Sequence, residues 1–145
     1  MEKQNFENHI RFYPPHHFVF YPVTLLLLGN SIYFAVSAPE QRAIWLFIAV
    51  IIALIIWVAF MLRQHYSMVL QNRIVRLELR YRYFALTGTR LETFEHQLDD
   101  SQLFALRFAP DEELHALVQR AVTENLSGKA IKKSIKNWKG DYHRV

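Results

Sequence analysis

Histidines are the residues of this sequence with the widest capacity for chemistry, because imidazole binds metals and exchanges protons near neutral pH. The chain has seven of them and no cysteine. His16, His17 and His65 flank two long apolar runs, and the register of those runs predicts that the three imidazoles lie near one another. Such a group could hold zinc or copper. Adjacent side chains of a helix diverge, however, and no carboxylate or fourth ligand accompanies them. We therefore interpret these histidines as polar residues at a membrane interface and expect no metal.

A second arrangement, Glu112-x-x-His115, has the spacing of a di-iron ligand pair. A di-iron site of that kind needs the pair twice with two further glutamates, whereas the chain contains it once. The sequence also lacks a phosphate-binding loop, a dinucleotide fingerprint, an HExxH motif and a nucleophile elbow. Without cysteine, disulfides, iron–sulfur clusters and thiol catalysis are excluded. We therefore predict a non-catalytic protein that holds no cofactor.

Two apolar stretches surround these residues, and both are long enough to cross a membrane. Residues 43–62 are 20 consecutive residues without a charge or a hydroxyl group. As a helix they extend about 30 Å, the thickness of the hydrocarbon core of a bilayer, and no face of that helix is polar. Residues 18–37 are also uncharged, although they include Pro22 and Asn30. A cleaved signal peptide is the rival interpretation of this first run, but its length and the mixed charge of residues 1–17 favour a retained span.

The short connection between the two runs, residues 38–42, predicts an antiparallel helical hairpin with both ends of the chain on one side. Six arginines lie in residues 63–90 on that side, whereas the connection contains Arg42 alone. By the positive-inside rule, the termini are cytoplasmic and the connection faces outward across a bacterial inner membrane. The predicted fold is therefore all-α: a cytoplasmic segment over residues 1–17, transmembrane helices over 18–37 and 43–62, and a helical cytoplasmic C-terminal part.

Small residues predict where the two transmembrane helices pack. Pairing the helices from their connection brings Ser31 opposite Ala49, and each begins a small-xxx-small step, Ser31/Ala35 and Ala49/Ala53, that permits close approach. Asn30 lies beside this face, inside the apolar run. Its amide could mark a ligand or ion path. An amide at such a position is more typical of a hydrogen bond across a helix pair or to a neighbouring protomer.

The cytoplasmic part begins with a predicted continuation of the second transmembrane helix over residues 63–86. Apolar residues recur there at steps of three and four and form a narrow seam: Tyr66, Leu70, Ile74, Leu77, Tyr81 and Phe84. The seam is under three heptads long, so it fits a short coiled coil and packing against the rest of the chain equally well. Residues 87–145 are predicted to form a small helical unit, with helices over 91–98, over 101–108, from Pro110 onward, and over 129–138.

The chain ends in a basic segment, residues 127–145, with five lysines, one arginine and one acid. Its predicted helix is apolar on one side, and the candidates for contact with a membrane surface or a partner are Lys129, Lys132, Lys133, Lys136, Trp138 and Lys139. Anionic lipid headgroups attract lysines by about 1 kcal/mol each. Residues 91–126 carry eight acids against two bases, so neutralisation inside the protein is an equal alternative. Nucleic acid is disfavoured, since lysines rather than base-reading Arg, Asn or Gln dominate the outer side.

Several stretches of the sequence resemble a family of small, uncharacterised bacterial membrane proteins, a domain of unknown function found in Bacteroidetes-like genomes. The stretches are QNFENHIRF, LQNRIVRLE, LRFAPDEELHALV, KAIKKSIKNW and DYHRV, and they span nearly the whole chain. The resemblance implies the layout with two transmembrane helices. It implies no activity, cofactor or catalytic residue.

These features together predict a small accessory, scaffold or self-assembling subunit of a membrane complex. Its expected contacts are the lipid bilayer, anionic lipid headgroups, and a protein partner or further copies of the same chain. Two alternatives from other classes stay open: a membrane-tethered nucleic-acid-binding regulator, and a metal- or cofactor-dependent subunit of a membrane enzyme. Binding of duplex DNA would favour the first alternative. Stoichiometric metal that is lost on His65→Ala would favour the second.

Overall fold

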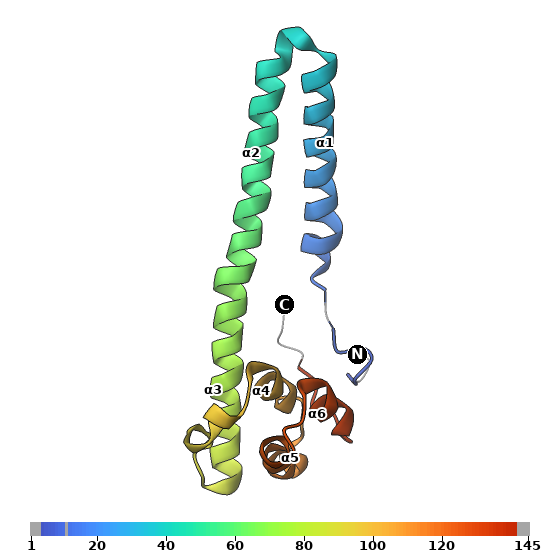
Figure 1. Ribbon diagram of the computed structural model, residues 1–145. Helices are drawn as coiled ribbons and strands as arrows, with labels where there is room; N and C mark the ends of the chain where they lie inside the picture. Colours follow the sequence, from blue (N-terminus) through green and yellow to red (C-terminus); the bar gives the residue numbers. More distant parts are fainter. Residues whose placement is uncertain (1–3, 11, 142–145) are drawn as a thin grey trace. The chain divides into compact units, whose positions relative to one another are not determined.

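A computed structural model describes residues 4–10 and 12–141, and these residues form helices and turns without a strand (Figure 1). The prediction of an all-α fold is confirmed. A π-helical turn, Pro15–Phe20, leads into α1 (Tyr21–Ser37), and a 3-10 turn, Pro39–Gln41, leads into α2 (Arg42–Met61). A second π-helical turn, Leu62–Ser67, joins α2 to α3 (Met68–Thr87). The shorter elements that follow are the 3-10 turns Leu91–Thr93 and Glu95–Gln97 and the helices α4 (Asp100–Leu106), α5 (Asp111–Thr123) and α6 (Gly128–Ser134).

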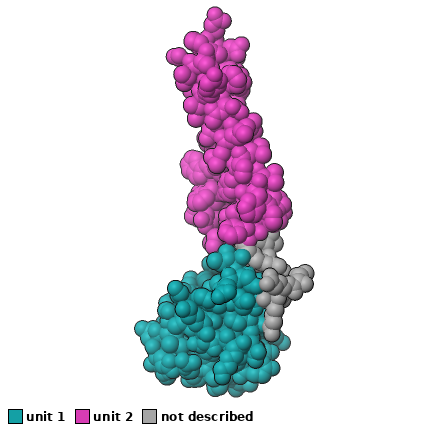
Figure 2. All heavy atoms as spheres, turned by 90° about the vertical axis from the view of Figure 1, so that its right-hand side faces the viewer, with its two compact units in different colours: residues 1–11, 70–144 teal, residues 12–69, 145 magenta. Residues whose placement is uncertain are grey.

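The chain divides into two compact units, which Figure 2 shows in different colours. One unit, here called the hairpin, comprises residues 12–69. The other, here called the bundle, comprises, among the described residues, 4–10 and 70–141. The bundle therefore includes the N-terminal segment and most of the helical extension that follows the second apolar run. From the sequence, both had been treated as separate parts.

The hairpin contains α1 and α2, which run antiparallel on either side of a tight connection (Figure 1). Pro22 lies directly after the π-helical turn Pro15–Phe20, close to the start of the continuous helical stretch Pro15–Ser37. Pro39 begins the 3-10 turn that reverses the chain. The Ser31 hydroxyl is satisfied within α1, because it donates to the carbonyl of Leu27 at 2.8 Å. A hydroxyl bonded in this way needs no water, which suits an apolar environment.

Apolar side chains cover the outside of the hairpin. Among the described residues, two helical stretches are long and apolar enough to cross a membrane, Pro15–Ser37 and Pro39–Thr87. In the most apolar window of each, 11% and 6% of the residues are buried, respectively. A core helix of a water-soluble protein is mostly buried, whereas large side chains such as Leu26, Phe47 and Trp57 are 60–68% exposed here. The hairpin thus has the kind of surface that a bilayer-spanning structure needs.

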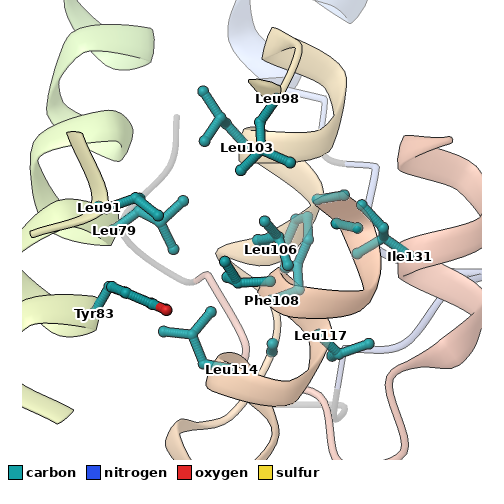
Figure 3. Packing of buried hydrophobic residues seen from close by; sticks show 14 of the residues in the cluster. Leu79, Tyr83, Leu91, Leu98, Leu103, Leu106, Phe108, Leu114, Leu117 and Ile131 are labelled. Carbon is teal, nitrogen blue, oxygen red and sulfur yellow. The ribbon is translucent and has the colours of Figure 1, made fainter. Parts of the chain in front are cut away.

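The bundle has a hydrophobic core to which α3, α4, α5 and α6 all contribute (Figure 3). Leu79 and Tyr83 extend from one face of α3, and Phe108 lies between α4 and α5. The members of this core with 1% or less of their surface exposed are Leu79, Tyr83, Leu91, Leu103, Ala105, Leu106, Phe108, Ala109, Leu114, Val118, Ala121 and Ile131. Removing these side chains from water is the main favourable term in the folding of this unit.

The short helices of the bundle begin at residues that satisfy their first backbone amides. The Asp99 carboxylate accepts from the backbone amide of Gln102, and the Gln102 side chain accepts from the backbone amide of Asp99, both at 2.7 Å. Hydrogen bonds from Ser101 and Gln102 lower the pKa of Asp99. The hydroxyl oxygen of Ser127 caps α6. α5 begins after Pro110 with three acids in its first turn, as the sequence predicted.

Residues 91–98 form two separate 3-10 turns in place of the predicted α-helix. Leu91 and Glu95 are four residues apart and would share one face of an α-helix. In the bundle they have unlike surroundings, since Leu91 is buried in the apolar core and Glu95 contacts arginines of α3. The backbone therefore breaks at Phe94, with φ −134° and ψ 4°, so that each side chain reaches its own partners.

The basic helix ends at Ser134, four residues earlier than the sequence predicted. Hydrogen bonds to residues outside the basic segment determine where this helix ends. The Glu113 carboxylate accepts hydrogen bonds from the backbone amides of residues 136 and 137, both at 3.0 Å. The backbone amide of Lys139 donates to the carbonyl of Phe108 at 2.8 Å. Because these long-range bonds replace helical ones, the chain leaves the helix at Ile135 in an extended conformation.

Candidate interaction surfaces

The contact face between α1 and α2 is built from small residues. Ser31 and Ala35 of α1 are 3% and 4% exposed, and Ala49 of α2 is 8% exposed. Near the connection, the rings of Phe34 and Trp45 stack with 4.8 Å between their centroids. Small side chains let two helices approach closely and gain dispersion contacts along their backbones. The structure thus brings Ser31, Ala35 and Ala49 into one face.

Ala53 lies outside this contact face, which corrects the sequence-based expectation. It is exposed, whereas the covered or partly covered positions of α2 recur at steps of three and four: Trp45, Ile48, Ala49, Ile52, Ile56 and Ala59. Ala53 is one residue beyond Ile52, about 100° further around the helix, and therefore faces away from α1. Residues on one face of a helix recur at intervals of three as well as four. Here the contact face continues from Ala49 to Ile52, three residues on, and does not include Ala53, four residues on.

Asn30 also lies outside the contact face. It is exposed, and among the described residues its side-chain amide has no hydrogen-bond partner. Gly29 beside it is equally open, since no atom lies within 4 Å of the position that a Cβ would occupy. A hydrogen bond from Asn30 across the α1–α2 pair is therefore absent from the described structure. In hydrocarbon an unpaired amide is costly, so the interpretation that fits this placement is a polar contact beyond the hairpin.

His16 and His17 lie side by side at the start of the hairpin, with 5.7 Å between their ring centroids. Both nitrogens of His17 are engaged: Nε2 accepts from Arg63 Nη1 at 3.0 Å, and Nδ1 therefore donates to the carbonyl of Tyr13 at 3.0 Å. His65 is exposed and does not complete a metal site with them. Within the described part of the chain, no group of three His, Asp or Glu side chains could hold a metal ion. Of the three histidines predicted to lie near one another, His16 and His17 form an adjacent pair, and His65 does not join them.

A buried carboxylate anchors α3 to the turns that follow it. Glu95 is 7% exposed and lies between Arg76 and Arg80, whose Nε atoms are 3.3 Å and 2.6 Å from its two oxygens. Arg76 also forms an ion pair with Asp100 at the start of α4. The hydrogen bond to Glu95 raises the pKa of Arg80. Because a buried charge is costly once it loses its partner, these two arginines hold the bundle together rather than standing open to an anionic ligand.

Arg82 connects α3 to the chain between α4 and α5. Its guanidinium donates to the carbonyls of Arg107 and Ala109 at 3.2 Å and 2.8 Å, and to the Asp111 carboxylate at 2.6 Å. This bond from Arg82 lowers the pKa of Asp111, and Lys139, 3.7 Å away, acts in the same direction. Asp111 thus lies between bases from the two basic blocks of the sequence. The alternating charge blocks neutralise one another inside the bundle at this point.

A shallow hollow of about 340 Å³ lies beside this cluster. It is lined by Val75, Glu78, Leu79, Tyr81, Arg82, Arg107, Lys139, Gly140 and Asp141. The bases in its lining have acidic partners: Arg82 and Lys139 contact Asp111, and Arg107 Nε is 3.5 Å from Asp141 Oδ2. Because the charges balance, the hollow has no surplus charge with which to select an anion or a cation.

The basic segment packs its apolar side into the bundle. Ile131 and Ile135 are buried, and the Trp138 ring lies 4.9 Å from that of Phe108, centroid to centroid. The side that was expected to be able to enter a membrane surface is therefore used within the protein. Residues 142–145, at the end of the segment, lie outside the described residues.

The lysines of this segment are placed in two ways. Lys132 is partly buried, with its Nζ 3.0 Å from His9 Nε2, and Lys139 is half exposed beside Asp111. The remaining lysines are exposed: Lys129, Lys133 and Lys136. Candidate contacts with headgroups or a partner are thus reduced from a whole amphipathic helix to these exposed lysines.

The N-terminal segment belongs to the bundle, and sequence reasoning missed this. Gln4 is 5% exposed, and its side chain pairs with the backbone of Asp141: Oε1 accepts from the amide at 2.8 Å, and Nε2 donates to the carbonyl at 3.4 Å. The His9 ring packs against Phe108 and Trp138 at 5.7 Å and 5.6 Å. The stretch QNFENHIRF shows no helical or strand period, so nothing in its pattern indicates a partner at the other end of the chain.

α3 has a second apolar face, opposite the one that the bundle core covers. The core covers Val75, Leu79 and Tyr83. The opposite face carries five side chains that are 51–73% exposed, Leu70, Ile74, Leu77, Tyr81 and Phe84, here called the outer seam. The sequence allowed this seam either to form a short coiled coil or to pack against the rest of the chain. Packing against the rest of the chain is not found among the described residues of the bundle.

The whole chain, residues 1–145, matches the model of a family of unknown function (DUF6526), and the chain belongs to that family. The resemblance to an uncharacterised family, inferred from the sequence motifs, is confirmed. No curated protein and no solved structure matches the chain. Membership of this family assigns no activity to the chain.

Proposed function

From a family without an assigned activity, we propose a non-catalytic inner-membrane protein of bacteria, whose hairpin crosses the bilayer and whose bundle and termini are cytoplasmic. It acts as an accessory, scaffold or self-assembling subunit of a membrane complex. The observation that supports this most is the exposure of the hairpin, whose most apolar window is 6% buried. Apolar surface of this extent is favourable in hydrocarbon and drives aggregation in water.

The distribution of arginines supports the proposed orientation. Arg42 is the one base near the connection, and its Nε donates to the carbonyl of Ala35 at 3.2 Å, which ties it to the end of α1. The opposite end of the hairpin continues into the arginine-rich residues 63–90. Such an excess of bases next to a transmembrane helix is typical of the cytoplasmic side.

The non-catalytic role is supported by how the polar groups of the bundle are used. Glu95 and Asp111 are bound by arginines of α3, and Glu113 accepts from two backbone amides. These bonds give each carboxylate a structural purpose. The exposed Lys129, Lys133 and Lys136 suit contact with anionic headgroups, at about 1 kcal/mol for each base near the surface.

Extraction of membranes at alkaline pH tests the proposal directly. A chain held by a spanning hairpin stays in the membrane pellet, whereas a peripheral protein is released. Because the chain has no cysteine, single substitutions then report orientation. In intact cells, a membrane-impermeant maleimide should label the Glu40→Cys variant, while the Lys129→Cys variant should be labelled only after permeabilisation. Release of the unmodified chain by alkali would refute the membrane assignment, and the reverse labelling pattern would refute the orientation.

A further inference from the structure

The outer seam of α3 has the spacing and residue types of a two-stranded coiled coil. Its residues follow one another at steps of four, three, four and three, which places Ile74 and Tyr81 at heptad position a and Leu70, Leu77 and Phe84 at position d. Ile74 at a with Leu70 and Leu77 at d is the combination that favours two parallel strands, and the remaining a and d positions carry the aromatic Tyr81 and Phe84. These side chains are more than half exposed, and an apolar stripe of this size on a folded unit marks an interaction surface.

The face of α3 that the bundle covers does not obstruct such a pairing. Val75, Leu79 and Tyr83 occupy positions b, f and c of the same heptads. In a coiled coil these positions point away from the partner helix. α3 can therefore hold the bundle on one side and a second helix on the other.

The charges beside the outer seam indicate which partner fits. Arg73 occupies position g and Glu78 position e, and both are exposed without an ion-pair partner among the described residues. In a parallel pair, position g of one helix meets position e of the following heptad on the other, so Arg73 meets Glu78 of a second copy. The symmetry of a dimer forms this pair twice. In an antiparallel pair, position g meets position g, and Arg73 would face arginine.

We propose that the outer seam joins two copies of this chain in a short, parallel coiled coil. The inference rests on the proposed function, because insertion in one bilayer orients all copies alike and so imposes the parallel arrangement that Arg73 and Glu78 require. Confinement to a membrane also raises the effective concentration of the partner. That increase favours pairing through a seam of under three heptads, which would be weak between freely diffusing chains.

Disulfide trapping in membranes tests the pairing, and the chain has no cysteine of its own to interfere. Leu77→Cys and Ile74→Cys place thiols at positions d and a, where the side chains of a parallel pair face each other within disulfide reach. Leu86→Cys is the matched control, because Leu86 is a leucine of the same helix, is 45% exposed, and occupies position f, which points away from the partner helix of a coiled coil. We expect mild oxidation to cross-link the first two variants several-fold more than the control. Equal cross-linking of all three would indicate random collision and overturn the proposal.

Charge reversal tests the register in the Leu77→Cys background. Arg73→Glu or Glu78→Arg alone makes two like-charged pairs and should weaken dimerisation about fivefold, while the double reversal restores it. Cross-linking that is unchanged by the single charge reversals would overturn the parallel register.

Alkaline extraction of the same samples separates the two proposals. If the chain stays in the membrane and the variants at 74 and 77 do not cross-link, the coiled coil is refuted and the membrane assignment stands. If the chain is released by alkali, the membrane assignment itself fails.

Discussion

Gly128 offers the sharpest test of how the bundle packs, because the structure leaves no room for a side chain there. A Cβ added to this residue would lie 2.5 Å from the carbonyl oxygen of Ser101 and 2.9 Å from its carbonyl carbon. Both are backbone atoms at the start of α4, so a side-chain rotation cannot relieve the clash. Gly128→Ala must therefore move α6 away from α4, although Leu103 and Ile131 on these helices are 1% or less exposed.

The size of the effect follows from two opposing terms. Overpacking of a dense core costs about 1–3 kcal/mol, while alanine in a helix gains about 0.5–1 kcal/mol over glycine. The net loss is therefore at most about 2.5 kcal/mol, and at about 4–8 °C per kcal/mol for a unit of this size the melting temperature falls by up to about 20 °C. Lys129→Ala, at the next and exposed position of α6, should leave the melting temperature nearly unchanged.

Hydrogen–deuterium exchange of the full chain in detergent micelles is a suitable assay, because it reports the bundle and the hairpin separately. In Gly128→Ala, exchange should accelerate over residues 100–106 and 128–134. Gly29→Ala is the converse control, since its Cβ would meet no atom within 4 Å, and it should slow exchange in α1 or leave it unchanged. Unchanged exchange in Gly128→Ala would refute the close packing of α4 on α6.

Three further substitutions test other contacts. Because Arg82 lowers the pKa of Asp111 in the folded state, this ion pair stabilises the bundle above about pH 4 and its contribution is lost as the pH falls through the lowered value. Asp111→Asn should therefore reduce the free energy of unfolding at pH 7 by about 0.5–1 kcal/mol, a value that allows for solvent screening at a half-exposed side chain. Denaturation measured over a series of pH values should show a smaller reduction below about pH 4. A reduction that does not change with pH would contradict the ion pair. Ala49→Leu should push α1 from α2 and destabilise the hairpin by about 1–3 kcal/mol in unfolding by SDS, whereas Ala53→Leu, at an exposed position, should not. Glu113→Ala should speed exchange of the two backbone amides that its carboxylate accepts, and Glu112→Ala should have no such effect.

Packing within the hairpin was partly predictable from the sequence. Small residues indicated a close approach of the two helices, and Ser31, Ala35 and Ala49 are indeed buried there. The predicted place of Ala53 was wrong, since it is exposed, whereas the exposure of Asn30 removes only one of the two contacts predicted for it, the hydrogen bond across the helix pair. The rotation of a helix about its own axis depends on every residue of the contact face, including the larger Ile52, and small residues alone do not determine it.

The structure of the bundle depended more on contacts between distant residues. The end of α6 is set by Glu113 and Phe108, and the place of the N-terminal segment by the pairing of Gln4 with Asp141. Neither contact leaves a periodic signal, because each joins a backbone group to a residue far away in the chain. Local patterns predict where helices begin, as at Pro110, more reliably than where tertiary hydrogen bonds end them.

The sequence by itself determined that this chain has two long apolar runs, the second of them 20 residues without a charge or a hydroxyl group, and a helix satisfies the backbone hydrogen bonds of such a run within the run itself. It also determined that the second of these leads into an arginine-rich helix with apolar residues on it. Only the tertiary structure decided which apolar face of α3 is covered. Leu77 and Leu79 each belong to a set of apolar residues with helical spacing, so periodicity alone does not indicate which of the two sets is buried. The choice is made by the side chains that pack against α3, which cover Leu79 and leave Leu77 exposed.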